Sequence, residues 1–530
     1  MSDFVHLHLH TEYSLLDGLT KIKKLAATLK DFNMKACAIT DHGNLYGAIE
    51  FYKTMVKNDI KPIIGCEIYT CLGDRHNKTS QNRKSYHLIL LAKDRQGYQN
   101  LIKIVSLGYF EGFYYKPRID WEILEKYHQG LICTSACPQG EIGSLILNNQ
   151  YDQGRDSAAK FQQLFGSDYY LEIQRHPGVK DMEKFGEGII KISRELGIPL
   201  VATNDSHYLK KEEAFAQDVL VMINTKTTTS TPNRMSMGDF PDFYVKNQDE
   251  MVSLYPDLTD AIKNTNKIAE MCNLEIEIGK WFFPKFKLPP KTTAEEHLKK
   301  LTYQNAQEYF GKLTPEIKER LNYELSVICP KGYSPYFLIM KDFIEWCEQN
   351  DTPTNTRGSA SGSLVSFVLG ITSVDPLVYQ LPFERFLNKD WPSPPDIDLD
   401  VADDQRQAML YHISEKYGQD AVAQICTFGR MMARGAVRDT ARVLGYEYAI
   451  GDRISKLIPL GSQGFPMSID KALNTTPELQ MMFDTDPDAQ KILSTAKQIE
   501  GCARHISVHA CGLVISPTTI NDFCPTQTET

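Results

Sequence analysis

The sequence contains no C-x-x-C pair and no apolar run long enough to cross a membrane. Its 12 cysteines are scattered, and the closest two are Cys133 and Cys137. This pattern argues against a disulfide framework and favours a reducing compartment. The first residues show none of the features of a signal peptide. We therefore expect a cytoplasmic protein that makes no contact with a membrane.

The sequence also lacks an excess of positive charge, because 58 lysines and arginines stand against 67 aspartates and glutamates, for a net charge of −9. Binding of nucleic acid through overall charge is therefore excluded, and any DNA-binding surface must be local. Hydrophobic residues make up 42% and charged residues 24%, which is ordinary for a folded protein. At 530 residues the chain is too long for one core, so about three or four domains are expected.

Three aspartates alternate with two aliphatic residues within residues 394–400, Pro-Pro-Asp-Ile-Asp-Leu-Asp. This is the period of a β-strand, which would place Asp396, Asp398 and Asp400 on one face and Ile397 and Leu399 in a core. The prolines cannot donate to a sheet, so the strand should begin near Asp396. Carboxylates spaced in this way can bind two divalent cations for in-line displacement at phosphorus. The alternative is an acidic edge strand or a solvated turn.

Residues 5–11 alternate in the same way and place His6, His8 and His10 on one strand face. Three histidines on one face are costly to bury without a charged or metal partner. Further apolar runs carry His, Asp, Glu or Cys and precede helical patterns, at residues 39–43, 64–67, 86–91, 134–138 and 201–207. This order is typical of a β/α barrel or a layered α/β fold with its chemistry at the strand C-terminal ends. These side chains suit Zn, Mn or Fe, and they outnumber the ligands of a single metal.

These motifs resemble the metal-ligand set of the PHP (polymerase and histidinol phosphatase) family. The resemblance implies a distorted seven-stranded barrel that holds two or three transition-metal ions, Zn²⁺ or Mn²⁺, and hydrolyses phosphate esters. His6 has no counterpart in the ligand set and is assigned a structural role, whereas His76, His128 and His176 are expected at the surface. The implied metal ligands are His8, His10, Asp17, His42, Glu67, His87, Cys137, Asp205 and His207.

Residues 356–365, Thr-Arg-Gly-Ser-Ala-Ser-Gly-Ser-Leu-Val, place small residues directly before an apolar helix. Open backbone N–H groups, serine hydroxyls and an arginine form a reasonable cradle for a triphosphate. The alternative is a flexible Gly/Ser turn. The carboxylate pair follows within one α/β unit, and a phosphate cradle and a carboxylate pair are the two halves of a nucleotidyltransferase site. The candidate nucleotide-binding residues are Arg357, Gly358, Ser359, Gly362 and Ser363.

Four arginines recur every four residues in the segment 430–442. On a helix they would form one inclined basic stripe, with Met432, Val437 and Leu444 facing inward. Such a stripe is usually only a solvated face, but here it lacks a full set of interleaved acids and suits contact with DNA phosphates. Residues 504–515 predict a basic loop that runs into a strand. The candidate DNA-binding residues are Arg430, Arg434, Arg438, Arg442 and Lys456.

In their order along the chain, these segments resemble the C family of bacterial replicative DNA polymerases, the DNA polymerase III alpha subunits. The resemblance implies an α/β protein with a PHP-type β/α barrel over residues 1–285. It further implies the first part of a palm similar to the DNA polymerase beta-like nucleotidyltransferases over 286–430, a helical thumb over 431–508 and the start of a second palm segment over 509–530.

The same resemblance implies template-directed transfer of nucleotides to a primer 3′-hydroxyl, with Mg²⁺ at the palm bound by the catalytic residues Asp396 and Asp398. Asp400 is the weaker candidate of the three. The PHP domain would act as a 3′→5′ proofreading exonuclease. The implied partners are primer-template DNA, deoxynucleoside triphosphates and other replisome subunits, including a sliding clamp bound through regions outside this sequence.

Two departures from the family pattern affect these expectations. Residues 354–356 are Thr-Asn-Thr where the family usually has Gly-Pro-Gly. The family's third catalytic aspartate lies in a strand beyond Thr530, so we expect this chain alone not to extend a primer.

Two alternatives stay open. The chain could be a free-standing PHP phosphoesterase, against which the palm and thumb patterns argue. It could also be a scaffold whose metals only stabilise the barrel, against which the complete ligand set argues.

Overall fold

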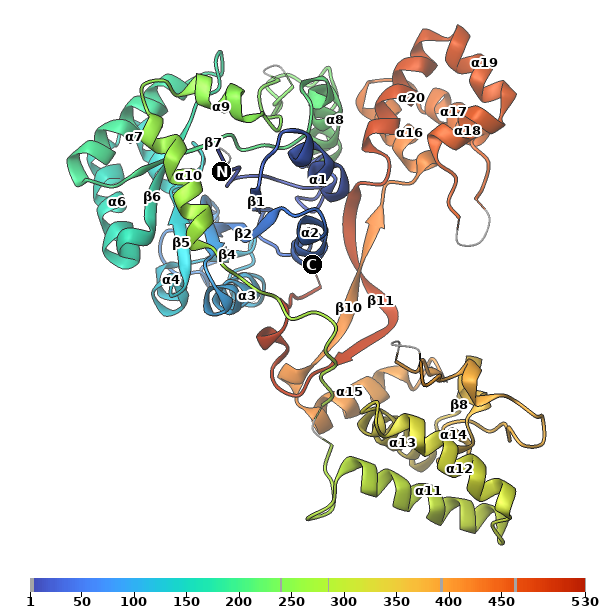
Figure 1. The fold of residues 1–530 in the computed structure, drawn as a ribbon. Coiled ribbons are helices and arrows are strands. Elements are labelled where there is room, and N and C mark those ends of the chain that lie inside the picture. The colour runs from blue at the N-terminus through green and yellow to red at the C-terminus, as the bar shows by residue number, and fades with distance from the viewer. Residues whose placement is uncertain (1–3, 239–240, 285, 391–393, 462–464, 530) are drawn as a thin grey trace. The chain divides into compact units, whose positions relative to one another are not determined.

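The computed structural model describes residues 4–238, 241–284, 286–390, 394–461 and 465–529 (Figure 1). The predicted domain limits at Lys285 and Thr530 lie outside the described residues. The chain divides into two compact units, of which unit 1 comprises residues 1–277, 426–509 and 521–530, and unit 2 comprises residues 278–425 and 510–520. Among the described residues, no helix is long and apolar enough to span a membrane.

A seven-stranded sheet organises unit 1, in the order β1-β2-β3-β5-β6-β7 with β4 paired to β2. β3 is antiparallel to both β2 and β5, and the other pairs are parallel. The strands are β1 (Ala36–Ile39), β2 (Lys61–Thr70), β3 (Tyr86–Ala92), β4 (Arg118–Ile119), β5 (Leu131–Thr134), β6 (Tyr169–Gln174) and β7 (Leu200–Thr203). Most of their residues are buried on both faces, as expected for a sheet that is covered by helices.

The N-terminal segment joins the two edges of this sheet. Ala38 of β1 donates its N–H to the carbonyl of His6 at 2.8 Å, and His10 donates to the carbonyl of Ser206, just after β7, at 2.8 Å. The segment thus bridges the first and last strands of the sheet order and completes a ring. The predicted α/β fold with a β/α barrel is confirmed.

Helices of ordinary amphipathic pattern surround the barrel sheet (Figure 1). In α1, for example, Ile22, Leu25 and Leu29 are buried on one face, and in α3 the Asp94 carboxylate caps the N-terminus by accepting from Gly97 N–H. The helices are α1 (Ile22–Asp31), α2 (Ala48–Lys57), α3 (Arg95–Phe110), α4 (Trp121–Tyr127), α5 (Glu141–Leu147), α6 (Tyr151–Phe165), α7 (Met182–Leu196), α8 (Ala214–Thr225), α9 (Gln248–Leu254) and α10 (Thr259–Met271).

The segment predicted as a thumb is helical and shares a core with α8. Buried Val437 and Leu493 belong to the same hydrophobic cluster as Val219, Leu220 and Met222 of α8. The helices of this segment are α16 (Ala433–Val443), α17 (Tyr448–Leu457), α18 (Ile469–Thr475), α19 (Pro477–Thr485) and α20 (Pro487–Ile499). Residues 426–509 therefore fold as part of the same compact unit as the barrel.

Unit 2 packs four longer helices and one short helix around a core that includes Leu321, Phe337 and Leu364. Its helices are α11 (Ala294–Phe310), α12 (Pro315–Ile328), α13 (Ser334–Gln349), α14 (Leu364–Val368) and α15 (Arg406–Tyr417). A two-stranded sheet pairs β8 (Thr354–Arg357) antiparallel to β9 (Asp398–Val401). A second pair, β10 (Val422–Arg430) with β11 (Ala503–Ile515), runs through both units. The expectation of a basic loop at the start of residues 504–515 is wrong, because β11 already begins at Ala503.

Candidate metal centre and nucleotide site

The predicted metal ligands lie on or just after the strands of the barrel. His8 and His10 belong to the N-terminal segment that closes the ring, and Asp17 follows it. Parallel strands bring their carboxyl ends to one edge of a sheet, so side chains that are distant in sequence meet there. The remaining ligands are His42 after β1, Glu67 in β2, His87 in β3, Cys137 after β5, and Asp205 and His207 after β7.

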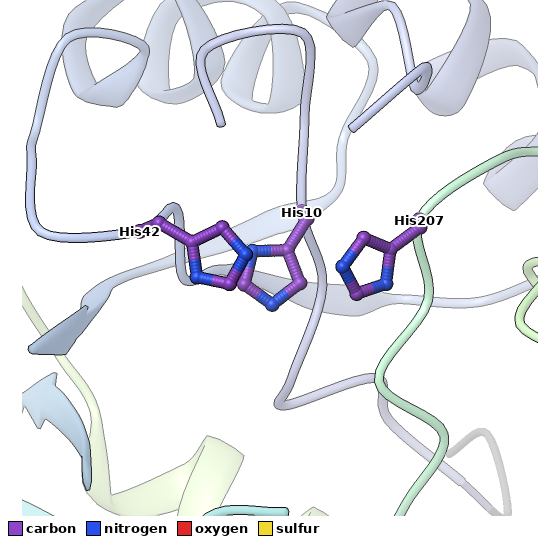
Figure 2. Close-up of side chains that lie close together, drawn as sticks. All are labelled: His10, His42 and His207. Atoms are coloured by element: carbon purple, nitrogen blue, oxygen red, sulfur yellow. The ribbon is translucent and has the colours of Figure 1, made fainter. Parts of the chain in front are cut away.

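Three overlapping groups of side chains have ligand atoms within 4.8 Å of one another. Figure 2 shows one of them, in which the ring of His10 lies between those of His42 and His207. The centroids of His10 and His42 are 4.1 Å apart, and those of His10 and His207 are 4.3 Å apart. The other groups are His8 with His10 and Glu67, and His42 with Glu67 and His87. Because the groups share members, the arrangement is suited to a cluster of ions.

The other predicted ligands lie beside these groups. Asp205 Oδ1 is 3.1 Å from His8 Nε2 and 3.2 Å from His10 Nε2. Asp17 Oδ2 is 3.1 Å from His42 Nε2. Cys137 Sγ is 3.6 Å from His87 Nδ1. The structure therefore brings the whole predicted ligand set together.

The surroundings of Glu67 test whether this set fits a metal. Glu67 is fully buried, and its carboxylate oxygens face imidazole nitrogens: Oε1 lies 2.7 Å from His87 Nδ1, and Oε2 contacts His42 Nδ1. Asp205 Oδ1 likewise faces His8 Nε2 and His10 Nε2. Carboxylates and imidazole nitrogens gathered away from water are costly unless protons or cations lie between them, and a bound metal ion can take that place. Imidazole nitrogens with carboxylate oxygens fit Zn²⁺ or Mn²⁺.

Burial and charge interactions inside the centre shift the pKa values of its side chains in different directions. Burial lowers the pKa of His10 to about 3, helped by the neighbouring rings of His42 and His207. Burial alone would raise the pKa of Glu67, but His87 and His42 outweigh it and hold the pKa well below its ordinary value. Burial, with Asp205 and Glu67, raises the pKa of the Cys137 thiol well above its ordinary value. The metal-free centre therefore has ionised carboxylates next to imidazoles, and its thiol keeps its proton.

Metal affinity should rise with pH. Burial by itself lowers the pKa of His42, but Glu67 and Asp17 outweigh it and raise the pKa to about 10. At neutral pH and without a metal, His42 is thus protonated, and an ion must displace that proton to bind the ring nitrogen. Below this pKa, each pH unit should strengthen binding about tenfold per proton released. Competition titrations of Mn²⁺ against a chelator between about pH 6.5 and 8.5 measure this dependence. An affinity independent of pH would contradict it.

Residues that support the ligands escaped the sequence analysis. Asp41 accepts hydrogen bonds from Thr11 N–H and Thr11 Oγ1 at 2.7 Å each and from Ser14 Oγ at 2.7 Å, which fixes the loop after His10. Glu172 of β6 lies 2.6 Å from His8 Nδ1. The available signal was a glutamate inside the apolar run of β6, where an ionisable side chain must have partners.

The histidines outside the predicted ligand set lie in different surroundings. His6 lies outside the ligand groups and bonds the carbonyl of Lys246 at 2.9 Å, in agreement with a structural role. His76 is exposed and His128 is half-buried. The surface position expected for His176 is wrong, because only 2% of this residue is exposed. His176 packs against Phe243 and bonds Asp242 at 3.0 Å.

In unit 2, Asp398 of the predicted catalytic pair borders the Gly/Ser segment. Asp396 and Asp398 are exposed and Ile397 between them is buried, which confirms the alternation, although β9 begins at Asp398 rather than Asp396. Arg357 lies opposite Asp398 in the β8–β9 register. Its guanidinium forms two hydrogen bonds to Asp400, at 2.5 and 2.8 Å, and these lower the pKa of Asp400. Asp400 therefore already has a cation, whereas Asp396 and Asp398 are the acids available to a metal.

The Gly/Ser segment forms the 3-10 helix η4 (Gly358–Gly362), which precedes α14. Gly358 has a φ of 83°, which an L-residue rarely adopts. The N-terminus of α14 is not open as expected from the sequence. The buried carboxylate of Glu324 accepts from Ser363 Oγ at 2.7 Å and from the N–H groups of Leu364 and Val365 at 2.8 and 2.9 Å. Phosphates would therefore contact η4 and Arg357 rather than the helix end.

Both parts of the chain match domains of known proteins. Residues 6–176 match the PHP domain, and residues 296–530 match the bacterial DNA polymerase III alpha NTPase domain. The chain is 45% identical over 529 residues to DNA polymerase III subunit alpha of Borreliella burgdorferi, covering 99% of this chain and 46% of that relative. It is 39% identical over 569 residues to the Aquifex aeolicus subunit, covering 99% and 48%.

The chain belongs to the family of bacterial DNA polymerase III alpha subunits. This confirms the resemblance seen in the sequence. The chain spans about half the length of the curated relatives it matches. Among solved structures, an amidohydrolase from Chromobacterium violaceum is similar at 15% identity with a TM-score of 0.26, covering 38% of this chain and 87% of that chain.

The four arginines that were predicted to form one basic stripe on a helix do not all lie on that helix. Arg430 ends strand β10 and is not helical, and its guanidinium donates to Glu12 and to the carbonyl of Gly501 at 2.7 Å each. Met432 is exposed rather than inward-facing, because it precedes the first turn of α16. Pairing of β10 with β11 outweighs the helical spacing at this end of the stripe.

The other basic side chains also have partners. Arg434 donates to the carbonyl of Ile458 at the C-terminus of α17. Arg438 and Lys456 both pair with Asp452, at 3.1 and 2.7 Å. Arg442 lies 3.6 Å from Asp439. Arg438, Arg442 and Lys456 are nevertheless each more than 40% exposed, so phosphates can reach them.

Arg434 and Arg438 should therefore behave differently. Arg438→Gln should weaken binding to primer-template DNA for all sequences and reduce the slope of log affinity against log salt by about one. Arg434→Gln should leave that slope unchanged and lower the free energy of unfolding by roughly 1–2 kcal/mol, because a charged donor at a helix end is lost. Binding titrations over a range of salt and denaturant unfolding measure both. Equal salt slopes for Arg438→Gln and the unaltered chain would contradict a phosphate contact.

Proposed function

We propose that the barrel centre hydrolyses phosphodiester bonds at the 3′ ends of DNA in a metal-dependent reaction. The observation that carries the proposal is the convergence of the predicted ligands around Glu67, whose buried oxygens face the ring nitrogens of His42 and His87. A single structural ion needs only about four ligands, so the larger set favours catalysis. The ions, two or three of Zn²⁺ or Mn²⁺, would supply a nucleophilic hydroxide at neutral pH and Lewis-acid support for the phosphate.

The chain's own ligands differ in their exposure, which indicates the substrate side. The side chains of His8, His10 and Glu67 are completely buried. Those of His42 and Asp17 are 15% and 18% exposed. A phosphodiester therefore approaches from the side of His42 and Asp17, while the buried ligands hold the centre in place and exclude water from its far side.

A second function, nucleotidyl transfer, is supported by the exposed pair Asp396 and Asp398, of which Asp398 lies next to Gly358 of η4. In this proposal the two aspartates bind Mg²⁺, and Arg357 with the Gly/Ser segment binds the phosphates of a deoxynucleoside triphosphate. Arg438, Arg442 and Lys456 contact primer-template DNA. Residues 1–285 act as the PHP domain, 286–430 and 509–530 as palm segments, and 431–508 as the thumb. The protein works in the cytoplasm with other replisome subunits, including a sliding clamp.

The hydrolytic proposal is tested on the purified chain after chelation and reconstitution with Mn²⁺ or Zn²⁺. A single-stranded oligonucleotide labelled at its 5′ end should be shortened stepwise from the 3′ end, and metal analysis should find more than one ion per chain. A mispaired 3′ end should be removed faster than a paired one. One ion or none, with no shortening, would instead favour the scaffold whose metal only stabilises the barrel.

A further inference from the structure

Strand β6 carries a carboxylate that no proposed step of the chemistry uses. Glu172 is completely buried, and it accepts hydrogen bonds from both flanking strands. Thr134 Oγ1, at the end of β5, donates to it at 2.6 Å, and Thr203 Oγ1, at the end of β7, donates to the other oxygen. Gln174 Nε2 donates at 2.8 Å. These donors satisfy the carboxylate oxygens inside the barrel.

The remaining contact of Glu172 is with a metal ligand. His8 Nδ1 lies 2.6 Å from Glu172 Oε1. A carboxylate accepts from an adjacent imidazole nitrogen, so Glu172 fixes a hydrogen on His8 Nδ1 and leaves Nε2 as the atom able to bind a metal. His8 Nε2 faces the centre at 3.1 Å from Asp205 Oδ1 and 3.4 Å from Glu67 Oε1.

We propose that Glu172 is a positioning residue that holds His8 in the tautomer and ring orientation required to bind a metal through Nε2. The inference rests on the proposed metal centre. A carboxylate behind a metal-bound histidine fixes the ring and makes it a stronger ligand. A neutral glutamine would present an N–H group as well as an oxygen, so it would no longer restrict the ring to one tautomer.

The effect should be confined to one part of the centre. His8 belongs to the group with His10 and Glu67, and it is absent from the two groups that contain His42. Loss of Glu172 should therefore weaken one ion and leave the ion bound near His42 and His87 in place. A role in general barrel stability would instead affect all ions together.

The test compares Glu172→Gln with the unaltered chain in titrations with Mn²⁺ alone and with Zn²⁺ alone. We expect one ion to bind about 10–100-fold more weakly, as for other residues behind metal ligands. The matched control is Glu141→Gln on α5, a half-buried carboxylate of the same unit that accepts from Ser157 and belongs to none of the ligand groups found among the described residues. It should leave every affinity unchanged.

Two further measurements separate positioning from folding. In the chain loaded with Zn²⁺ and labelled with ¹⁵N-histidine, His8 should keep a hydrogen on Nδ1 with Nε2 bound to the metal, and Glu172→Gln should change that signature. If Glu172→Gln does not fold, Thr134→Val keeps the carboxylate, removes one donor and should weaken the same ion roughly three- to tenfold. Unchanged affinities and an unchanged tautomer would overturn the inference while leaving the metal centre intact. Absence of bound metal in the unaltered chain would instead overturn the proposed function.

Discussion

Asp205→Asn should abolish metal-dependent shortening of DNA 3′ ends and remove at least one bound ion. Asp205 Oδ1 lies within 3.2 Å of the Nε2 atoms of both His8 and His10, so this carboxylate occupies the position of a shared ligand. Asparagine keeps the shape but loses the negative charge that offsets the ions. Loss of fixed charge where the transition state needs it costs at least about 100-fold in rate. The assay is hydrolysis of a 5′-labelled oligonucleotide together with metal analysis.

The control for Asp205→Asn is Asp257→Asn, which removes an exposed carboxylate of the same unit that pairs with Arg175. It should retain both metal and activity. His10→Ala should reproduce the loss, because His10 belongs to two of the ligand groups. Hydrolysis at an undiminished rate by Asp205→Asn would show that the activity comes from another site or from a contaminating nuclease.

The test uses a polymerase that includes this chain and is as long as its relatives. In that polymerase, Asp396→Asn and Asp398→Asn should each eliminate nucleotide addition. Both carboxylates are exposed, Asp398 next to Gly358 of η4, and Ile397 between them is buried in the core. Each substitution removes a ligand and a charge from the proposed Mg²⁺ site, while the surface that contacts DNA is unchanged. Single-nucleotide incorporation should fall at least about 100-fold, and the affinity for primer-template DNA should stay within about twofold.

Asp400→Asn provides the comparison on the same strand. Asp400 is paired with Arg357, so its substitution should weaken nucleotide binding through Arg357 and leave much of the maximal rate. Incorporation measured over a range of nucleotide concentrations separates these effects. A near-normal rate for Asp396→Asn or Asp398→Asn would assign the pair to an ordinary acidic edge, and an inactive Asp400→Asn would make Asp400 a metal ligand as well.

The sequence was sufficient to predict that the side chains of the proposed ligand set converge, and the resemblance to the PHP family named the set. His8 and His10 alternate with apolar residues, and the other ligands follow or lie in apolar runs that form strands. Strand periodicity is a local property, and strand ends of a barrel meet at a common edge, so these side chains converge whatever the details of packing. The exposure of Asp398 and the burial of Ile397 were predictable for the same reason.

Tertiary structure alone decided features whose partners are distant in the chain. The spacing of Arg430 suits a helix, but hydrogen bonding between β10 and β11 makes it a strand residue. The N-terminus of α14 looked open because Glu324, which closes it, comes from α12. Likewise, Glu172 has a role only because β5 and β7 place threonines beside it and the N-terminal segment places His8 against it.

Periodicity along the chain fixed which side chains face the inside of the barrel, since it depends only on near neighbours. The proton positions, the closed helix end and the pairing of each arginine depend on which distant groups arrive at contact distance. A buried carboxylate such as Glu172 or Glu324 must be fully hydrogen-bonded, and its donors come from whichever strands and helices the fold places around it. The sequence therefore determined which side chains meet in the proposed metal centre, and the packing of the strands around them determined how they are held.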